Sequence, residues 1–249
     1  MSDPKASVLA ASMRKLEKRF EFSPEDRAAF LALPVFTKTL DVGSYIVREG
    51  DIARNCCILL TGFAYRHKIV GDGTRQIVSI HIPGDMVDLH NSFLGIADHN
   101  VQMLTTGNVA LIPAKAVQDI AYDHPAIGRA MLLDTLVDGS IFREWIANVG
   151  RRDARCRLAH LLCELAVRLQ ATGENGTRDY CVPMSQEQLA DATGLTPVHI
   201  NRVMQSLRSD GLISTDKRSV TIENWAGLTA TGDFNTAYLH PEAAGGQPR

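Results

Sequence analysis

Apolar residues recur at two different periods along the chain, and the change of period divides it. Residues 7–22 repeat them at helical spacing, and Ser23 begins a second helix that ends near Pro34. From Thr39 onward, short β-prone runs alternate with turns rich in Gly and Asp, roughly every ten residues. This pattern predicts a small antiparallel barrel or sandwich, closed by a short helix over residues 114–122.

A long amphipathic run over residues 126–149 follows Pro125. Some of its apolar side chains repeat at intervals of three and four residues, which suits a narrow coiled-coil seam. That seam comprises Leu132, Leu136, Gly139, Phe142, Ile146 and Val149. Gly139 lowers helix stability by about 1 kcal/mol relative to Ala, so it favours a close approach at the seam. A single helix buried against the barrel explains a wide apolar face equally well.

Residues 184–213 predict two short helices joined by a tight turn. Ser185 begins the first helix, with Gln188 closing a capping box, and Gly194 permits the turn. Thr196 begins the second helix, whose apolar face repeats at i, i+3, i+4 and i+7. The opposite face is polar and carries His199, Asn201, Arg202, Gln205 and Arg208. This arrangement describes a helix-turn-helix; the alternative is an ordinary helical hairpin whose polar face meets water.

The residues that follow favour the DNA-binding interpretation. A turn at residues 209–213 leads to Lys217 and Arg218, and residues 219–222 alternate like a strand. A two-stranded wing with basic residues at its tip is the usual companion of a DNA-reading helix. The run resembles the DNA-binding domain of the Crp/Fnr superfamily of bacterial transcription regulators. The segment GLTPVHINR is similar to a recognition-helix variant found in that family.

The β-prone region carries a second resemblance to the same superfamily. Its patterns G-x-x-I, E-G-D, L-L-x-G and P-G-D, between about Val35 and Pro113, resemble the family's β-roll sensor domain. The resemblance implies an α+β fold with an N-terminal antiparallel β-roll, like a cyclic-nucleotide-binding domain, a long dimerisation helix and a C-terminal winged helix-turn-helix. One stripe of the long helix would pack on the roll and the other on a partner's matching helix. We expect the N-terminal helices and the sensor domain at residues 1–124 and the dimerisation helix at residues 125–150. The DNA-binding domain would follow at residues 151–225, and a C-terminal tail at residues 226–249.

The expected roll departs from the pattern of family members that bind cyclic nucleotides. Those members carry a Gly-Glu pair after the P-G-D strand and an Arg-Ser pair further on, which contact the ribose hydroxyl and the cyclic phosphate. Here Asp88 and Leu89 replace the Gly-Glu pair, and residues 97–100 contain no arginine. An acidic residue without a basic partner repels a phosphate, so we expect an effector other than cyclic AMP. Its candidate pocket comprises Asp88, His90 and Asn91.

Neither a cofactor nor an enzyme activity is predicted. His81 and His90 lack the H-x-H…E spacing of a metal-binding barrel, so we expect no metal. Haem ligation by His81, His90 or His99 is an open alternative, since some relatives sense gases in that way. No cysteine precedes Cys56, and we therefore do not expect the N-terminal iron–sulfur cluster of some Fnr-type members. The sequence also lacks G-x-S-x-G and a phosphate-cradling Gly loop.

The net charge argues against a protein that coats DNA in general, and the cysteine count and apolar pattern indicate a cytoplasmic location. The 249 residues carry a net charge of −2, so cationic residues would act locally. An odd count of five cysteines suggests free thiols that pack as small hydrophobes. No run approaches the roughly 18 apolar residues of a membrane span, and the start is unlike a signal peptide. We expect a cytoplasmic protein without a membrane partner.

Together these observations predict a regulator that binds a near-palindromic operator in double-stranded DNA as a homodimer. Arg202 matches the family's base-contacting arginine by position, and His199 and Asn201 are further base readers. The family commonly has Glu four residues before that arginine; here Val198 stands in its place, which implies a different half-site. The expected contacts to the DNA backbone are Ser185, Gln186, Thr196, Gln205, Lys217 and Arg218.

RNA polymerase is a further candidate partner. Two other classes stay open: a haem- or ligand-sensing module that signals mainly through a protein partner, and a barrel enzyme with a vestigial winged helix. The sequence does not identify the effector or the operator, and it does not distinguish an activator from a repressor.

Overall fold

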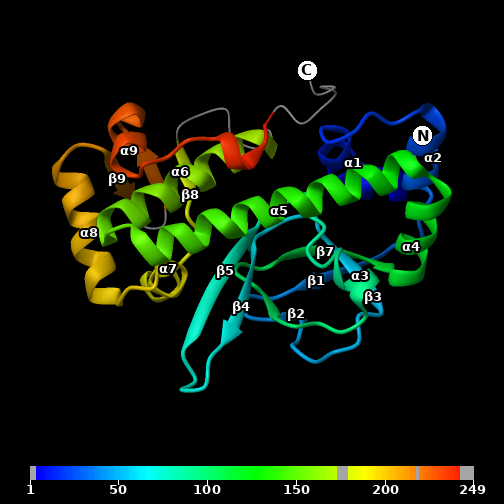
Figure 1. Cartoon of the computed structure of the whole chain (residues 1–249), viewed down its shortest axis with the longest axis horizontal. Coiled ribbons are helices and arrows are strands. Elements are labelled where there is room, and N and C mark those ends of the chain that lie inside the picture. The colour runs from blue at the N-terminus through cyan, green and yellow to red at the C-terminus, as the bar shows by residue number, and fades with distance from the viewer. Residues whose placement is uncertain (1–3, 173–178, 217–218, 242–249) are drawn as a thin grey trace. The chain divides into compact units, whose positions relative to one another are not determined.

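The computed structural model describes residues 4–172, 179–216 and 219–241 (Figure 1). The chain forms two compact units. Of the described residues, the first unit contains 4–66, 80–140 and 239–241; the second contains 67–79 and those between 141 and 238. We call them the β-roll unit and the winged-helix unit.

Two helices precede the sheets of the β-roll unit, as predicted: α1 (Pro4–Glu17) and α2 (Pro24–Leu31). Ser23 caps α2, because its hydroxyl accepts from the Asp26 backbone N–H at 3.1 Å. The Asp26 carboxylate accepts from the Ser23 backbone N–H at 3.0 Å, which completes a capping box. Leu9 and Phe30 from these helices are fully buried in a core shared with β3, β7, α4 and α5.

The roll consists of two sheets with strand orders β1-β7-β3 and β2-β6-β4-β5. The pairs β1–β7, β3–β7 and β2–β6 are antiparallel. The strands are β1 (Phe36–Leu40), β2 (Tyr45–Val47), β3 (Asn55–Leu59), β4 (Ala64–Ile69), β5 (Arg75–His81), β6 (Asn100–Met103) and β7 (Gly107–Pro113). The predicted barrel or sandwich is thus confirmed as a pair of sheets.

Strand β3 separates two apolar clusters. Cys56 packs with the helical core, whereas Cys57 packs inside the roll with Val87 and Met103. Adjacent side chains of a strand point to opposite faces, so both thiols are buried in different surroundings. Burial raises the pKa of the Cys56 thiol to about 12. These two cysteines therefore pack as small hydrophobes, as the sequence suggested.

Three helices follow β5 in the chain: α3 (Asn91–Leu94), α4 (Ala114–Asp123), which closes the roll, and α5 (Pro125–Arg151). The predicted long helix is therefore confirmed. Its buried side includes Ile127, Met131 and Trp145. A second stripe is exposed, with Leu136 at 56% and Ile146 at 69% of full exposure.

The winged-helix unit is built on α6 (Ala154–Thr172). Five leucines of α6, at the three- and four-residue spacing of one helical face, are buried: Leu158, Leu161, Leu162, Leu165 and Leu169. Strands β9 and β10 form the predicted two-stranded wing, and β8 pairs with β10 as a third strand, in the order β8-β10-β9. The strands are β8 (Asp179–Cys181), β9 (Ile213–Asp216) and β10 (Ser219–Ile222). In the described part of the chain, no helix combines the length and apolar character that a bilayer crossing requires.

Part of the segment expected as a C-terminal tail, at residues 226–249, is helical. It forms α9 (Trp225–Thr231), which packs on α6, and the short 3-10 helix η1 (Ala237–Leu239). A Cβ atom at Gly232 would lie 2.7 Å from the backbone N of His160, so glycine permits this close approach. Residues 242–249 lie outside the described residues.

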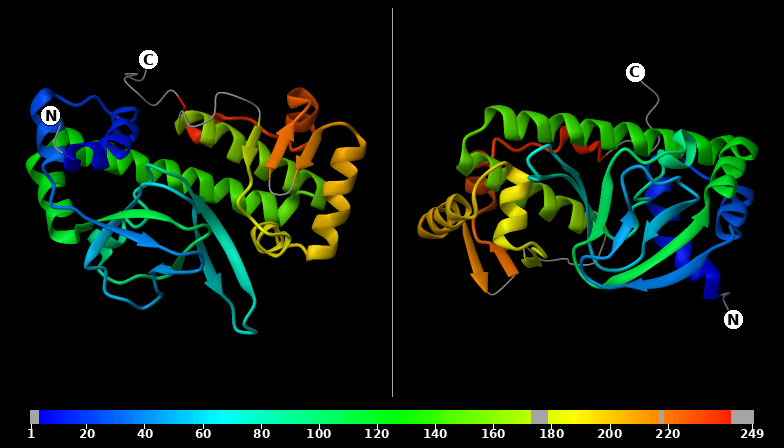
Figure 2. Two further views of the ribbon diagram at one scale, coloured as in Figure 1. Left: turned by 180° about the vertical axis from the view of Figure 1, so that it is seen from behind. Right: turned by 90° about the horizontal axis from the view of Figure 1, so that it is seen from below.

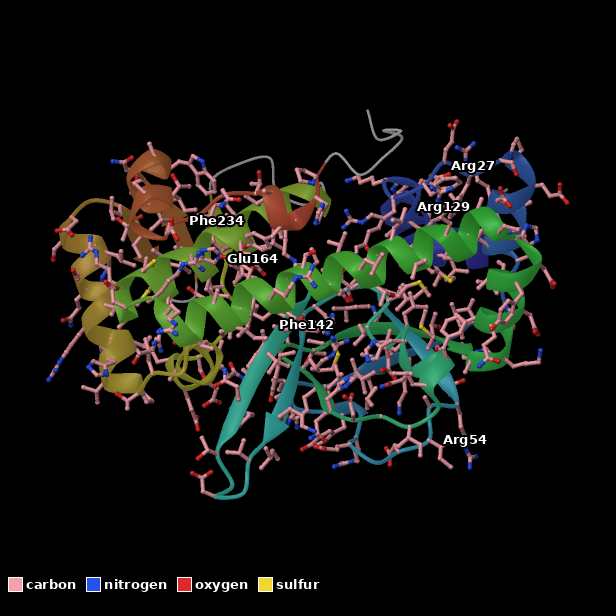
Figure 3. The ribbon with its side chains drawn as sticks, viewed as in Figure 1. Arg27, Arg54, Arg129, Phe142, Glu164 and Phe234 are labelled. Carbon is pink, nitrogen blue, oxygen red and sulfur yellow. The ribbon has the colours of Figure 1, made fainter. Side chains whose placement is uncertain are left out.

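A buried polar network holds the same segment. Glu164 of α6 (Figure 3) is fully buried and accepts from Trp145 Nε1 at 3.0 Å and from the Tyr238 hydroxyl at 2.8 Å. The ring of His160 packs edge-on against Phe234 and stacks on Tyr238. Phe234 and Tyr238 therefore pack against α6, and both belong to the winged-helix unit.

Candidate nucleic-acid interface

The predicted helix-turn-helix is formed by α7 (Gln186–Thr193) and α8 (Pro197–Ser209). Ser185 caps α7 and Gln188 completes the capping box, as predicted. Gly194 ends α7 in the left-handed region with φ 64°, a backbone conformation that favours glycine. Thr196 then caps α8, accepting from the His199 backbone N–H at 3.3 Å. Local sequence signals thus set both ends of the turn.

Helix α8 is fixed from two sides. Ile200, Val203 and Leu207 bury its apolar face. At its C-terminal end, Arg155 of α6 pairs with Asp210 and donates to the Ser206 hydroxyl. The wing and α8 lie side by side (Figure 2). Ion pairs and packing therefore orient the helix before any ligand binds.

Helix α7 is held by two arginines. Arg157 of α6 donates from Nη1 to the Thr193 carbonyl at 3.1 Å, at the end of α7. Arg75 of β5 pairs with Asp191, with Nη2 and Nε at 2.6 and 2.7 Å from the same carboxylate oxygen. Gln76 donates to the Asp191 carbonyl at 2.7 Å. No local pattern in the sequence indicated these long-range contacts.

The polar face of α8 is exposed. The described candidate DNA contacts are all exposed: His199, Asn201 and Arg202 among the base readers, and Ser185, Gln186, Thr196 and Gln205 among the backbone contacts. Arg208 is also exposed, but it donates to the Thr215 hydroxyl of the wing at 3.2 Å. Lys217 and Arg218 lie outside the described residues. The face resembles a DNA-reading surface in composition: an arginine fork, an amide and an imidazole on one rigid helix.

Val198, which departs from the family pattern of the recognition helix, lies on the surface. Its side chain is 62% exposed on the first turn of α8. An exposed apolar group among base-reading side chains can contact the methyl group of thymine. Its position one residue before His199 was the available signal.

The structure divides the predicted effector residues between two environments. Asp88 and Asn91 are buried, and the Asn91 amide donates to the Asp88 carboxylate. His90 is half-buried and lines a mainly apolar pocket of about 430 Å³. The other lining residues are Leu89, Phe93, Leu94, Ala121, Tyr122, Gly128, Met131, Leu132 and Thr135.

The ionisable side chains around Asp88 are buried or half-buried. Burial raises the pKa of Asp88 to about 6, while the nearby Arg66 guanidinium opposes that rise. Burial, Arg66 and His99 lower the pKa of His90 to about 4, so His90 is neutral at pH 7. Arg66 itself is buried and donates from Nη2 to the Val87 carbonyl at 2.7 Å. No local sequence pattern connects Arg66 or His99 with Asp88.

Two family models match the chain on either side of α5. A cyclic nucleotide-binding domain matches residues 37–124, and a Crp-like helix-turn-helix domain matches residues 156–231. The first match falls on the roll together with α4, and the second on α6, the helix-turn-helix, the wing and α9. The unpredicted helix α9 is therefore part of the family's domain.

Known bacterial regulators are similar in sequence to about three quarters of the chain. The transcriptional activator protein FnrL of Cereibacter sphaeroides is 27% identical over 197 residues, which cover 78% of this chain and 79% of FnrL. The nitrogen fixation regulation protein FixK of Rhizobium meliloti is 28% identical over 192 residues, covering 76% and 83%. Among solved structures, FixK2 from Bradyrhizobium japonicum superposes with a TM-score of 0.74 at 22% identity, covering 80% of this chain and 98% of FixK2. The chain belongs to the Crp/Fnr superfamily of DNA-binding transcription regulators.

Proposed function

We propose that this regulator binds a near-palindromic operator as a homodimer through α8. The main support for the proposal is that α8 exposes its polar face while its apolar face is buried. Both of its ends are held, by the Thr196 cap and by Arg155. A helix fixed in this way can enter the major groove without losing further conformational freedom. The relatives are transcription regulators, so a sensing module that signals mainly through a protein partner is not favoured.

Base recognition rests on the first half of α8. Arg202 presents a planar fork of donors that suits guanine O6 and N7, while Asn201 and His199 offer further donors and acceptors. Val198 adds an apolar contact to a thymine methyl group. Each well-placed bidentate contact discriminates against the wrong base by about 1–3 kcal/mol.

Backbone contacts position these readers. Ser185, Gln186 and Thr196 lie at the N-terminal ends of α7 and α8, where backbone N–H groups and the helix dipole favour phosphate. Gln205 extends the same exposed face. Lys217 and Arg218 are proposed from the sequence as wing contacts. Contacts of this kind orient the protein on DNA and carry no sequence information themselves.

Dimerisation is proposed through the exposed stripe of α5. Leu132, Leu136 and Ile146 are exposed on one side of the helix, and Gly139, Phe142 and Val149 are half-buried along the same stripe. Burying such a stripe against its own copy removes apolar surface from water. The two-fold axis would then place two α8 helices about 34 Å apart, one turn of DNA.

The roll is proposed to sense an effector other than cyclic AMP. The pocket beside His90 is mainly apolar, which suits a small apolar ligand better than a cyclic phosphate. We further propose that the protein has no catalytic activity of its own, acts in the cytoplasm and contacts RNA polymerase when bound to DNA.

The direct test is an electrophoretic mobility shift assay. It is run first with a pool of random duplex DNA and then with the sequence from that pool that the protein binds best. Arg202→Ala should weaken binding to that sequence by about 1–3 kcal/mol. Arg54→Ala, at an exposed arginine of the β-roll unit, is the matched control (Figure 3). Equal weakening of Arg202→Ala on all sequences would make Arg202 a phosphate contact. A wild-type protein that shifts no duplex would refute the proposal.

A further inference from the structure

Asp88, His90 and His99 form a cluster that no sequence motif indicated. One donor atom from each residue lies within 4.8 Å of the other two. All three belong to one segment of twelve residues, which contains α3. The backbone of this segment is fixed at its far end, where the Ala97 N–H donates to the Asp51 carbonyl at 2.9 Å.

The chemistry of the donors is that of a transition-metal site. Two imidazoles and one carboxylate bind Zn²⁺, Fe²⁺ and similar divalent ions, and they leave at least one coordination position open. The Nε2 atom of His99 lies 3.8 Å from Asp88 Oδ1. Two donors bound to one tetrahedral ion at about 2.1 Å lie about 3.4 Å apart, so a shift of about 0.4 Å completes this pair.

A second carboxylate orients His99 as a ligand. His99 Nδ1 donates to Asp98 Oδ1 at 2.6 Å, and the other ring nitrogen, Nε2, is the one that lies near Asp88. Metal-binding histidines usually donate their other ring nitrogen to a carboxylate or carbonyl in this way. The ring of His90 lies 5.2 Å from that of His99, at an angle of 36°. His99 is therefore oriented by one carboxylate and lies beside a second imidazole.

Burial and charge are also compatible with a bound cation. Asp88 and His99 are buried, and His90 lines the apolar pocket, which gives the site an entrance. The positive charge of Arg66 opposes a bound cation. Its guanidinium interacts with four carboxylates, those of Asp138, Asp88, Asp98 and Asp85. Two carboxylates at the cluster, Asp88 and Asp98, therefore face one guanidinium that is shared among four acids.

We propose that Asp88, His90 and His99 form a binding site for one divalent first-row transition-metal ion in the β-roll unit. The proposal departs from the expectation of no metal, which rested on local spacing alone. It concerns the β-roll unit only and does not depend on DNA binding.

The test is a titration of chelator-treated full-length protein with Zn²⁺ by isothermal titration calorimetry. We expect one ion per chain. The double variant His90→Ala/His99→Ala should lose this binding, and Asp98→Asn should weaken it about 10–100-fold without changing the stoichiometry. The matched control is His124→Ala, because His124 pairs with Asp26 outside the cluster; it should bind like the wild type.

Anomalous diffraction from crystals grown with Zn²⁺ locates the ion without any variant. A peak among the three donors supports the site even if the double variant fails to fold. The proposal is overturned if the wild type takes up no ion, if the double variant binds as well as the wild type, or if the peak lies elsewhere. A haem absorption band on haem addition, with no uptake of Zn²⁺, would also overturn it in favour of haem. None of these results would alter the DNA-binding proposal.

Discussion

The Tyr238 hydroxyl should stabilise the winged-helix unit through the buried carboxylate of Glu164. It donates to Glu164 Oε2 at 2.8 Å and lies 3.1 Å from His160 Nε2. Burial, with a further contribution from Glu164, raises the pKa of Tyr238 above its usual range, so the hydroxyl stays protonated. Tyr238→Phe removes this donor and keeps the ring. Glu164 is then left with Trp145 and Arg168.

The expected loss is about 1.5–2 kcal/mol in the free energy of unfolding. A hydrogen bond to a charged group contributes about 1.5–3 kcal/mol, and the two remaining donors place the loss in the lower part of that range. With a urea m-value of about 1–3 kcal/mol/M, the unfolding midpoint should fall by about 0.5–2 M. The ring contacts with His160 and Phe234 persist, so a larger loss is not expected.

Tryptophan fluorescence during urea unfolding is a suitable assay. The chain has two tryptophans, Trp145 and Trp225, and both belong to the winged-helix unit. Tyr122→Phe is the matched control, since Tyr122 is 75% exposed on α4; it should change the midpoint little. An unchanged midpoint for Tyr238→Phe, or an equal fall for both variants, would refute the role of the network.

Three further predictions concern other parts of the chain. Ser185→Ala should destabilise the winged-helix unit by about 1 kcal/mol in the same urea assay, because it removes the α7 cap; no loss would show that the cap is dispensable. Leu136→Asp should shift the protein toward monomer in sedimentation velocity, whereas Val42→Asp, at an equally exposed apolar residue of the roll, should not; a dimer unaffected by Leu136→Asp would exclude the α5 seam. In the native protein at pH 8, a thiol reagent should modify the exposed Cys181 well before the buried Cys56, whose raised pKa leaves little thiolate; faster labelling of Cys56 would contradict the buried packing.

Features set by neighbouring residues could be predicted from the sequence. Ser23, Ser185 and Thr196 each lie directly before a helix and cap it as expected. The alternation of Cys56 and Cys57 follows from strand geometry alone. The wing and the stripe of α5 follow from period-two and three-four spacing. In each case the residues that determine the structure lie within a few positions of one another.

Features set by distant residues could not be predicted in this way. Helix α9 is short and contains Gly227, and it depends on packing against α6. The ion pair of Arg75 with Asp191 joins residues far apart in the chain. The approach of His99 to Asp88 requires the turn at α3, and no standard metal-ligand spacing indicates it. Such contacts depend on the complete fold.

In vitro selection from random duplex DNA tests the central claim most directly, because it reports sequence preference and symmetry together. The wild-type chain should enrich a near-palindrome whose half-sites lie one helical turn apart. Arg202→Ala should enrich the same spacing but lose preference at one base pair in each half-site. No enrichment, an unrepeated site, or an unchanged preference in Arg202→Ala would contradict the proposal that α8 reads DNA as one of a symmetric pair.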